Sequence, residues 1–262
     1  MMGERRQRGL ALVSVLWGIA ILSLIAAAMM TASVTSARIG HNVWDATRAS
    51  AVADIAVNRA ILSLMDDRAK HQPRVDGVPA DNTFDGAPAR LWIQDESGKI
   101  NVNGADKTAL QALFAAQGMS DGDAGALADT VIARRSPQTP YHATEELLAA
   151  PGMSRALYGR IAPLITAYGH AAGVNTQVAP PGVLRVMPGM TDQAVRELLT
   201  AREASRSLTL ASADTTSAPL AQSGGTFLIT AEVHVGKAHL VRSAAVMFTG
   251  DDSNPYVILG WH

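Results

Sequence analysis

The stretch Leu10-Ala-Leu-Val-Ser-Val-Leu-Trp-Gly-Ile-Ala-Ile-Leu22 begins an uncharged run that continues to Ala37. A bilayer core is spanned by about 20 apolar residues, so this run predicts a membrane helix. The segment in front of it is rich in arginine, which by the positive-inside rule keeps residues 1–9 in the cytoplasm and places the remainder outside. The alternative interpretation is a cleaved secretory signal peptide, for which Ala26-Ala27-Ala28 offers small residues.

Helix-compatible sequence continues well past the predicted membrane segment. No proline occurs before Pro73, and helix-compatible sequence runs to about Ala69, so one helix of roughly 60 residues is expected. The pattern of its outer half predicts a broad apolar face that a sheet or a domain should cover. The residues assigned to that face are Ile55, Val57, Ile61, Leu62, Leu64 and Met65.

Composition excludes several classes of site. The chain has 262 residues, a formal net charge of −1 and no cysteine. Disulfides, cysteine-ligated zinc, iron–sulfur clusters and thiol nucleophiles are therefore excluded. The net charge near zero excludes an overall polybasic surface for nucleic acid. Only 5% of the residues are aromatic, which argues against a stacking platform for single-stranded nucleic acid.

Strand patterns lie at both ends of the body of the chain. Residues 90–94 and 99–102 predict two strands joined by a turn at Glu96-Ser97-Gly98, while 226–235 and 238–248 predict a hairpin around Gly236-Lys237, followed by a last strand at 256–261. About a hundred residues between them read as helical. The expected fold class is α+β: a long helix packed on an antiparallel sheet, with a large inserted all-α subdomain.

The predicted insertion contains an internal repeat. Its units are Gly118-Met119-Ser120, Gly152-Met153-Ser154 and Gly189-Met190-Thr191. In each, the glycine is suited to close a helix in the left-handed conformation, the methionine to fill a gap in the core, and the hydroxyl to cap the next helix. The units therefore predict helix–hairpin–helix (SAM-like) elements.

Two other functions fit parts of this pattern. Helix–hairpin–helix pairs bind DNA without sequence specificity in some proteins, so a membrane-anchored extracytoplasmic DNA-binding protein is the alternative function. Basic and acidic residues nearly balance between residues 105 and 204, which makes nucleic acid an unfavourable partner. Gly118 to Gly122 also match the Gly-x-Ser-x-Gly nucleophile elbow of a hydrolase using Ser120, but the preceding residues read as a helix rather than the required strand.

Histidines and acidic clusters were considered as metal ligands. The histidines show no His-Glu-x-x-His spacing. His234 and His239 lie on either side of a hairpin turn and could pair across it, but they are interpreted as solvated strand residues rather than metal ligands. Oxygen clusters that a calcium ion would favour are Asp121 with Asp123, Asp251-Asp252 with Asn254, and Asp81 with Asp85. None matches an EF-hand loop, and each is explained by a turn or a helix cap.

Arg8-Gly9 followed by Leu10-Ala-Leu-Val-Ser-Val-Leu16 resembles the leader of type IV pilin-like proteins. The resemblance implies cleavage by prepilin peptidase after Gly9 and N-methylation of Leu10. Most of these proteins carry glutamate at the fifth mature position, where this chain has Ser14. The K-class minor pseudopilins of type II secretion lack that glutamate, and the chain resembles them over nearly its whole length, including Ser97 to Asn103 and Tyr256 to Trp261.

The K-class resemblance implies a non-enzymatic subunit at the tip of a periplasmic pseudopilus, anchored by a single pass in the inner membrane of a Gram-negative cell. Implied partners are the I- and J-class minor pseudopilins, the major pseudopilin, prepilin peptidase, the inner-membrane assembly platform, membrane lipid and secreted cargo. The family also implies calcium in the soluble domain, for which no ligands are assigned; no other cofactor is expected. The expected division is a leader (1–9), transmembrane segment and pilin helix (10–75), first part of the pilin sheet (76–104), helical insertion (105–204), linker (205–225) and C-terminal strands (226–262).

Overall fold

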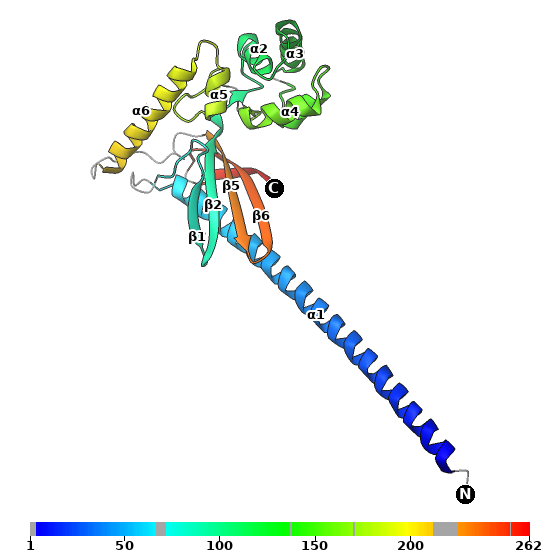
Figure 1. Ribbon diagram of the computed structural model, residues 1–262. Helices are drawn as coiled ribbons and strands as arrows, with labels where there is room; N and C mark the ends of the chain where they lie inside the picture. Colours follow the sequence, from blue (N-terminus) through cyan, green and yellow to red (C-terminus); the bar gives the residue numbers. More distant parts are fainter. Residues whose placement is uncertain (1–3, 67–71, 137, 170, 212–224, 252) are drawn as a thin grey trace.

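A computed structural model describes residues 4–66, 72–136, 138–169, 171–211, 225–251 and 253–262, with side chains omitted before residue 12 and at 208–211. A single helix, α1, runs from Glu4 to Leu64, and the rest of the described chain gathers around and beyond its C-terminal end (Figure 1). The prediction of a helix of this length is confirmed. At about 1.5 Å per residue it is roughly 90 Å long.

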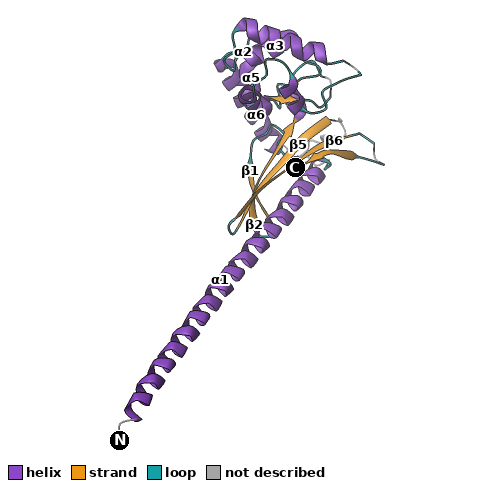
Figure 2. Ribbon diagram, turned by 90° about the vertical axis from the view of Figure 1, so that its right-hand side faces the viewer, coloured by secondary structure: helices purple, strands orange, loops and turns teal. Residues whose placement is uncertain are grey.

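The N-terminal half of α1 stands free of the rest of the protein in both views (Figures 1 and 2). Among the described residues, α1 is the one helix long and apolar enough to cross a membrane. Its large apolar side chains between Leu12 and Val34 are exposed. This half of the helix is therefore compatible with a single-pass membrane anchor.

The main sheet has five antiparallel strands in the order β1-β2-β5-β6-β7. Their bounds are β1 Ala80–Phe84, β2 Ala87–Asp95, β5 Gly225–Val235, β6 Ala238–Phe248 and β7 Tyr256–Trp261. The expected hairpin around Gly236-Lys237 and the last strand are confirmed. Gly236 has a φ of 55°, the left-handed conformation that this tight turn requires.

The expected pairing of residues 90–94 with 99–102 is wrong. Strand β2 already has a neighbour on each edge, β1 on one side and β5 on the other, so no edge is left for a third strand. The chain instead turns through a short 3₁₀ helix, η2 (Glu96–Gly98), and β3 (Ile100–Asn101) pairs in parallel with β4 (Ile165–Thr166). Strand β1 was not predicted, because it lies in a stretch rich in turn-forming residues.

The sheet packs on the C-terminal part of α1 through small side chains. Ala49, Ala53, Ala56 and Ala60 are all at most 2% exposed, and their spacing of three or four residues follows the helical repeat. Val52, Val57, Ile61 and Leu64 complete this buried face. Alanine lets the helix approach the strands closely, which explains why the contact stripe is poor in large residues.

The predicted helix face is therefore partly wrong. Ile55 and Leu62 are 42% and 58% exposed, whereas Val57, Ile61 and Leu64 are buried as expected and Met65 packs at the edge of the core. At 100° per residue, Ile55 and Leu62 lie on the side of α1 opposite to the alanine stripe. The prediction is wrong for Ile55 and Leu62 because it used only large apolar residues and left out the four alanines that also face the sheet.

The inserted unit lies beyond the C-terminal end of α1 (Figures 1 and 2). Its elements are α2 Lys107–Ala115, α3 Asp121–Arg134, η3 Thr144–Ala149, α4 Arg155–Ile161, η4 Ala162–Leu164, α5 Pro181–Val186 and α6 Asp192–Ala211. The unit has a hydrophobic cluster of its own, separate from the clusters under the sheet. Ile100 and Val102 belong to this cluster, so residues 100–104 join the insertion rather than the sheet.

Helix α6 continues past the expected end of the insertion. It covers 205–211 of the segment interpreted as a linker, and residues 212–224 of that segment lie outside the described residues. Arg74, in the chain leading to β1, bonds both Asp76 (2.7 Å) and Glu203 of α6 (2.9 Å). Arg202 donates to the carbonyl oxygen of Ala179 at 2.8 Å, which ties α6 to the rest of the unit.

Candidate assembly surfaces

The three repeat units form the corners between helices of the inserted unit. Gly118, Gly152 and Gly189 have φ angles of 93°, 93° and 78°, which place all three in the left-handed region that favours glycine. The methionine that follows each glycine points into the core of the unit: Met153 is 9% exposed, and Met119 and Met190 pack against its edge.

The hydroxyl that ends each unit caps the next helix. Ser120 Oγ accepts a hydrogen bond from the amide of Asp123 (3.2 Å) and donates to its carboxylate (2.7 Å). The hydroxyls of Ser154 and Thr191 accept from the amides three residues further on, at 3.1 and 3.2 Å. Ser120 follows helix α2 and begins helix α3, so it does not sit on the strand-to-helix turn that a hydrolase nucleophile elbow requires.

Most basic side chains of the inserted unit already have partners within it. Lys107 bonds Asp129, Arg134 bonds Glu146, and Arg185 lies 4.0 Å from Asp192. The guanidinium groups of Arg135, Arg160 and Arg202 donate to backbone carbonyl oxygens. Non-specific DNA binding depends on cations free to neutralise phosphates, so this arrangement does not favour that alternative.

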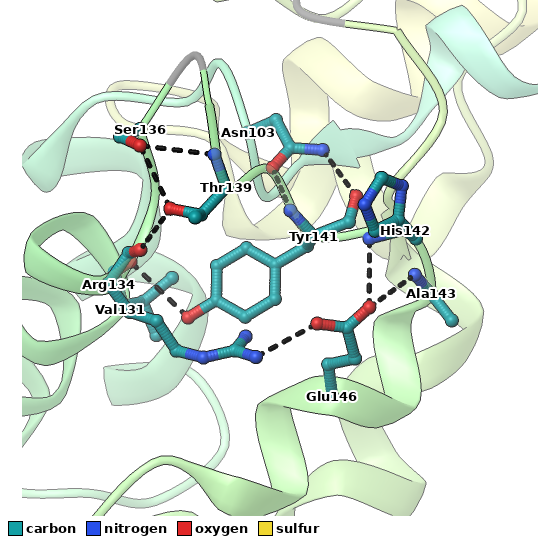
Figure 3. A network of polar contacts seen from close by, with 9 residues as sticks. All are labelled: Asn103, Val131, Arg134, Ser136, Thr139, Tyr141, His142, Ala143 and Glu146. Carbon is teal, nitrogen blue, oxygen red and sulfur yellow. Dashed lines mark hydrogen bonds and ion pairs between the residues drawn. The ribbon is translucent and has the colours of Figure 1, made fainter.

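A buried tyrosine holds the connection between α3 and η3 (Figure 3). Tyr141 is 1% exposed, and its hydroxyl donates to the carbonyl oxygen of Val131 at 3.3 Å. The side chain of Asn103 accepts from the amide of Tyr141 (2.8 Å) and donates to its carbonyl oxygen (2.9 Å). The guanidinium of Arg134 lies 4.5 Å from the ring centroid, within the range of a cation–π contact.

Arg134 and Glu146 join this connection to the next helix (Figure 3). They form an ion pair of 2.9 Å, and Glu146 also accepts from the backbone amides of His142 (2.9 Å) and Ala143 (3.3 Å). The hydrogen bond from Arg134, with the amide of His142, lowers the pKa of Glu146. A carboxylate held ionised by such donors suits a structural role better than proton transfer.

A tight contact joins the inserted unit to the sheet at η2. A Cβ atom added to Gly98 would lie 2.6 Å from the carbonyl oxygen of Val178, so only glycine permits this approach. The amide of Asn175 donates to the carbonyl oxygen of Ser97 (2.8 Å), and Gln94 Nε2 donates to that of Val178 (3.1 Å). Backbone and side-chain bonds together therefore set the position of the insertion relative to β2.

A hollow of about 700 Å³ opens between the inserted unit and the edge strand β7. Its lining comes from η2, the segment before η3, β4 and the C-terminal strand. Lys99 and Glu96 form an ion pair of 2.7 Å in this lining, with side chains 9% and 4% exposed. Such a buried pair holds both charges in one geometry at the base of the insertion.

The acidic clusters considered for calcium make local contacts. Asp123 bonds the hydroxyl of Ser120, and Asp251 Oδ1 accepts from both the amide (2.9 Å) and the hydroxyl (2.7 Å) of Ser253. Asp252 lies outside the described residues. Calcium binding therefore stays a prediction without assigned ligands.

An exposed apolar stripe runs along α1 on the side away from the sheet. Trp44, Ile55 and Leu62 are 66%, 42% and 58% exposed, and Ala51 lies between them. Spacings of seven and four residues put all four on one side of the helix, the pattern by which helices pack side by side. Two members of this stripe, Ile55 and Leu62, are those that the sequence analysis expects under the sheet.

The expected processing residues lie far from the folded body. Gly9 and Leu10 are within the helical backbone of α1, and their side chains are outside the described part of the structure. Ser14 is on the exposed N-terminal half of the same helix. These positions are therefore at the opposite end of α1 from the insertion (Figure 1).

Comparison with known proteins gives one line of independent support for the resemblance to K-class minor pseudopilins. No family model and no curated protein sequence matches the chain. A solved structure does match: the GspK chain in the crystal structure of the GspK-GspI-GspJ complex from the type 2 secretion system of enterotoxigenic Escherichia coli. The TM-score is 0.51 at 16% identity, and the match covers 86% of this chain and 98% of that chain.

The chain has the GspK fold. The resemblance to K-class minor pseudopilins, drawn from the leader and scattered motifs, is thus confirmed at the level of structure. The match covers 86% of this chain, so the part left unmatched is too short to contain the whole inserted unit. The large insertion is therefore part of the shared architecture.

Proposed function

We propose that this protein is a minor pseudopilin of a type II secretion system. In this role it is the tip subunit of the periplasmic pseudopilus, primes pseudopilus assembly and supports export of folded proteins across the outer membrane, without catalysis of its own. The carrying observation is the GspK fold itself, in which a free apolar helix, a sheet on its distal half and a bulky insertion follow in one line (Figure 1).

The position of the insertion supports the tip role. In a pilus built from parallel pilin-like helices, each subunit is stacked above the previous one along the helix direction. The inserted unit lies beyond the end of α1 that carries the sheet, where the next subunit would have to stack (Figures 1 and 2). A subunit of this shape ends the stack, while its free N-terminal helix remains available to subunits below.

The exposed stripe of α1 supports association with other minor pseudopilins. The matched structure is a complex of GspK with GspI and GspJ. We assign to this chain I- and J-class partners that pack along Trp44, Ala51, Ile55 and Leu62, because this stripe is apolar and lies opposite the chain's own sheet. The major pseudopilin, the assembly platform, membrane lipid and cargo complete the proposed partners, with residues 1–9 cytoplasmic and the folded body periplasmic.

Identifying the N-terminal residue of the mature protein tests whether the chain is a pseudopilin. The full chain is produced with and without the host's prepilin peptidase, and the N-terminal peptide is identified by mass spectrometry. We expect peptidase-dependent cleavage after Gly9 and an N-methylated Leu10. Cleavage near Ala28, or an intact N-terminus in both strains, would contradict the proposal.

The inserted unit tests the tip role separately. Residues 99–211 are replaced by a short Gly/Ser linker that reconnects β2 to β5, and secretion is measured after the variant is shown to reach the membrane at the normal level. If the insertion ends the stack, this variant is expected to lose its capping role, so that secretion falls and subunit order changes in cross-linking. Normal secretion and normal cross-links would refute the tip assignment.

A further inference from the structure

The outer face of the β5–β6 hairpin brings three side chains with metal-binding atoms together. Glu232 and His234 alternate with the buried Ala231 and Val233, so they lie on the face of the sheet turned away from α1. His239 on β6 is the direct cross-strand partner of His234. The sequence places His234 and His239 across a turn from one another, but Glu232 becomes a neighbour of His239 only through the strand register.

We propose that Glu232, His234 and His239 form a binding site for a late first-row divalent cation, Zn²⁺ being the reference case. The ligand atoms of all three residues lie within 4.8 Å of one another. The proposal concerns a property separate from pseudopilus assembly and does not rest on the function proposed above.

The distances suit a metal of this size. His239 Nε2 and His234 Nε2 lie 2.9 and 3.6 Å from the same atom, Glu232 Oε1. With metal–ligand bonds of about 2.0–2.1 Å, two ligands of one zinc ion are about 3.0–3.5 Å apart. Both histidine–carboxylate spacings are therefore close to those of a formed site. The imidazole lone pairs lie in the planes of the two stacked rings, so the rings must turn out of the stack to converge on one ion.

The hairpin geometry aligns the two rings in advance. The turn has two residues, so the pair next to it, Val235 and Ala238, is hydrogen bonded and the following pair, His234 and His239, belongs to the closer non-hydrogen-bonded class. The rings are stacked, with centroids 4.4 Å apart and an interplanar angle of 17°. Two histidines at paired positions of adjacent strands lose less entropy on binding than two on mobile loops, because the backbone already holds them side by side.

The surrounding charges leave the carboxylate available. Arg90 on β2 is the cross-strand neighbour of Glu232, but its guanidinium bonds Asp81 on β1 at 3.2 Å. An adjoining hollow of about 220 Å³, lined in part by Asp81, Arg90 and His234, gives water and ions access.

The donor set selects the class of ion. Two imidazole nitrogens and one carboxylate oxygen suit Zn²⁺, Cu²⁺ or Ni²⁺, whereas Ca²⁺ and Mg²⁺ prefer oxygen ligands alone. Three protein ligands leave one position of a tetrahedral site for water. Because the ligands come from both strands, a bound ion also cross-links β5 to β6.

The test uses the full chain in detergent, without a histidine tag, titrated with ZnCl₂ against a competing zinc indicator at pH 7.5. We expect saturation at one Zn²⁺ per chain and at least a roughly tenfold loss of affinity in each of His234→Gln, His239→Gln and Glu232→Gln, equal to about 1.4 kcal/mol or more. His142→Gln, which replaces an exposed histidine of the inserted unit, is the matched control and should bind normally.

Copper provides a second readout. Electron paramagnetic resonance of the Cu²⁺-loaded chain should show two nitrogen ligands, and each histidine variant should show one. Side chains of His234 and His239 are 63% and 52% exposed, so these variants are expected to fold. The alternative is that Glu232 only bonds a protonated histidine pair. In that case zinc binding to the chain will not saturate, or zinc will bind equally to the wild type and to the His234→Gln, His239→Gln double variant. Either result overturns the proposal.

Discussion

Two adjacent residues of α1 provide a direct test of how the helix is oriented on the sheet. Ile61 is 1% exposed and Leu62 is 58% exposed, although both are large apolar residues. Replacing either by alanine removes three carbon atoms. For Ile61 this loses about 2.5 kcal/mol of burial at about 0.8 kcal/mol per carbon, and the cavity left under the sheet raises the loss to roughly 3–4 kcal/mol.

The same truncation at Leu62 should cost about 0.5 kcal/mol or less, because most of this side chain already contacts solvent. The assay is thermal unfolding of the full chain in detergent, followed by circular dichroism. At about 2–4 °C per kcal/mol, Ile61→Ala is expected to lower Tm by roughly 10 °C, and Leu62→Ala by about 2 °C or less. Equal shifts in the two variants would refute the orientation of α1 described here.

The pair also separates folding from assembly. Leu62→Asp should leave Tm nearly unchanged but reduce co-purification with the I- and J-class minor pseudopilins, because it places a charge in the exposed stripe. Arg59→Asp, at an exposed position of the same helix outside that stripe, is the control. Unchanged co-purification of Leu62→Asp would exclude the stripe as the partner contact.

Two further predictions concern the joints of the inserted unit. Gly98→Ala places a Cβ atom 2.6 Å from the carbonyl oxygen of Val178 and should destabilise the protein by about 1–3 kcal/mol. Gly159→Ala, whose Cβ atom would have nothing within 4 Å, should leave stability unchanged or raise it. Urea unfolding compares the two variants, and equal stabilities would contradict the close approach at Gly98. Burial alone would raise the pKa of Asp76, but the hydrogen bond and charge of Arg74 lower it below the ordinary 3.8. The Asp76 carboxylate therefore stabilises the fold above about pH 4, and this contribution is lost as pH falls through the lowered pKa. The stability difference between wild type and Asp76→Asn should shrink from pH 7 to about pH 3, and a difference independent of pH would show that the ion pair does not contribute.

Local sequence was sufficient for the elements whose cause is local. The uncharged run after Gly9 and the absence of proline before Pro73 predict α1, since helix continuity depends on neighbours along the chain. Gly236-Lys237 similarly predicts the β5–β6 hairpin, because a tight turn needs a left-handed residue. The resemblance to the K class likewise rests on local sequence, namely Arg8-Gly9 before the uncharged run and serine rather than glutamate at position 14.

Local sequence patterns do not predict which distant segments of the chain pair with one another. The pattern at 99–102 is strand-like whether its partner is β2 or β4, and only the occupation of both edges of β2 sends it into the inserted unit. The apolar pattern of α1 likewise contains two stripes. The stripe that meets the sheet is the one that lets the strands lie closest to α1, and this is the side with the alanines.

Residues close together in the chain are sufficient to predict the long helix, its apolar N-terminal half and the β5–β6 turn, because each of these features has a local cause. Tertiary structure alone decided the side of α1 left for partners, the contact of Gly98 with Val178 and the meeting of Glu232 with two histidines. These features arise from strand register and from backbone approach between segments far apart in sequence. Their residue types are individually ordinary, so their meaning appears only when folding brings them together.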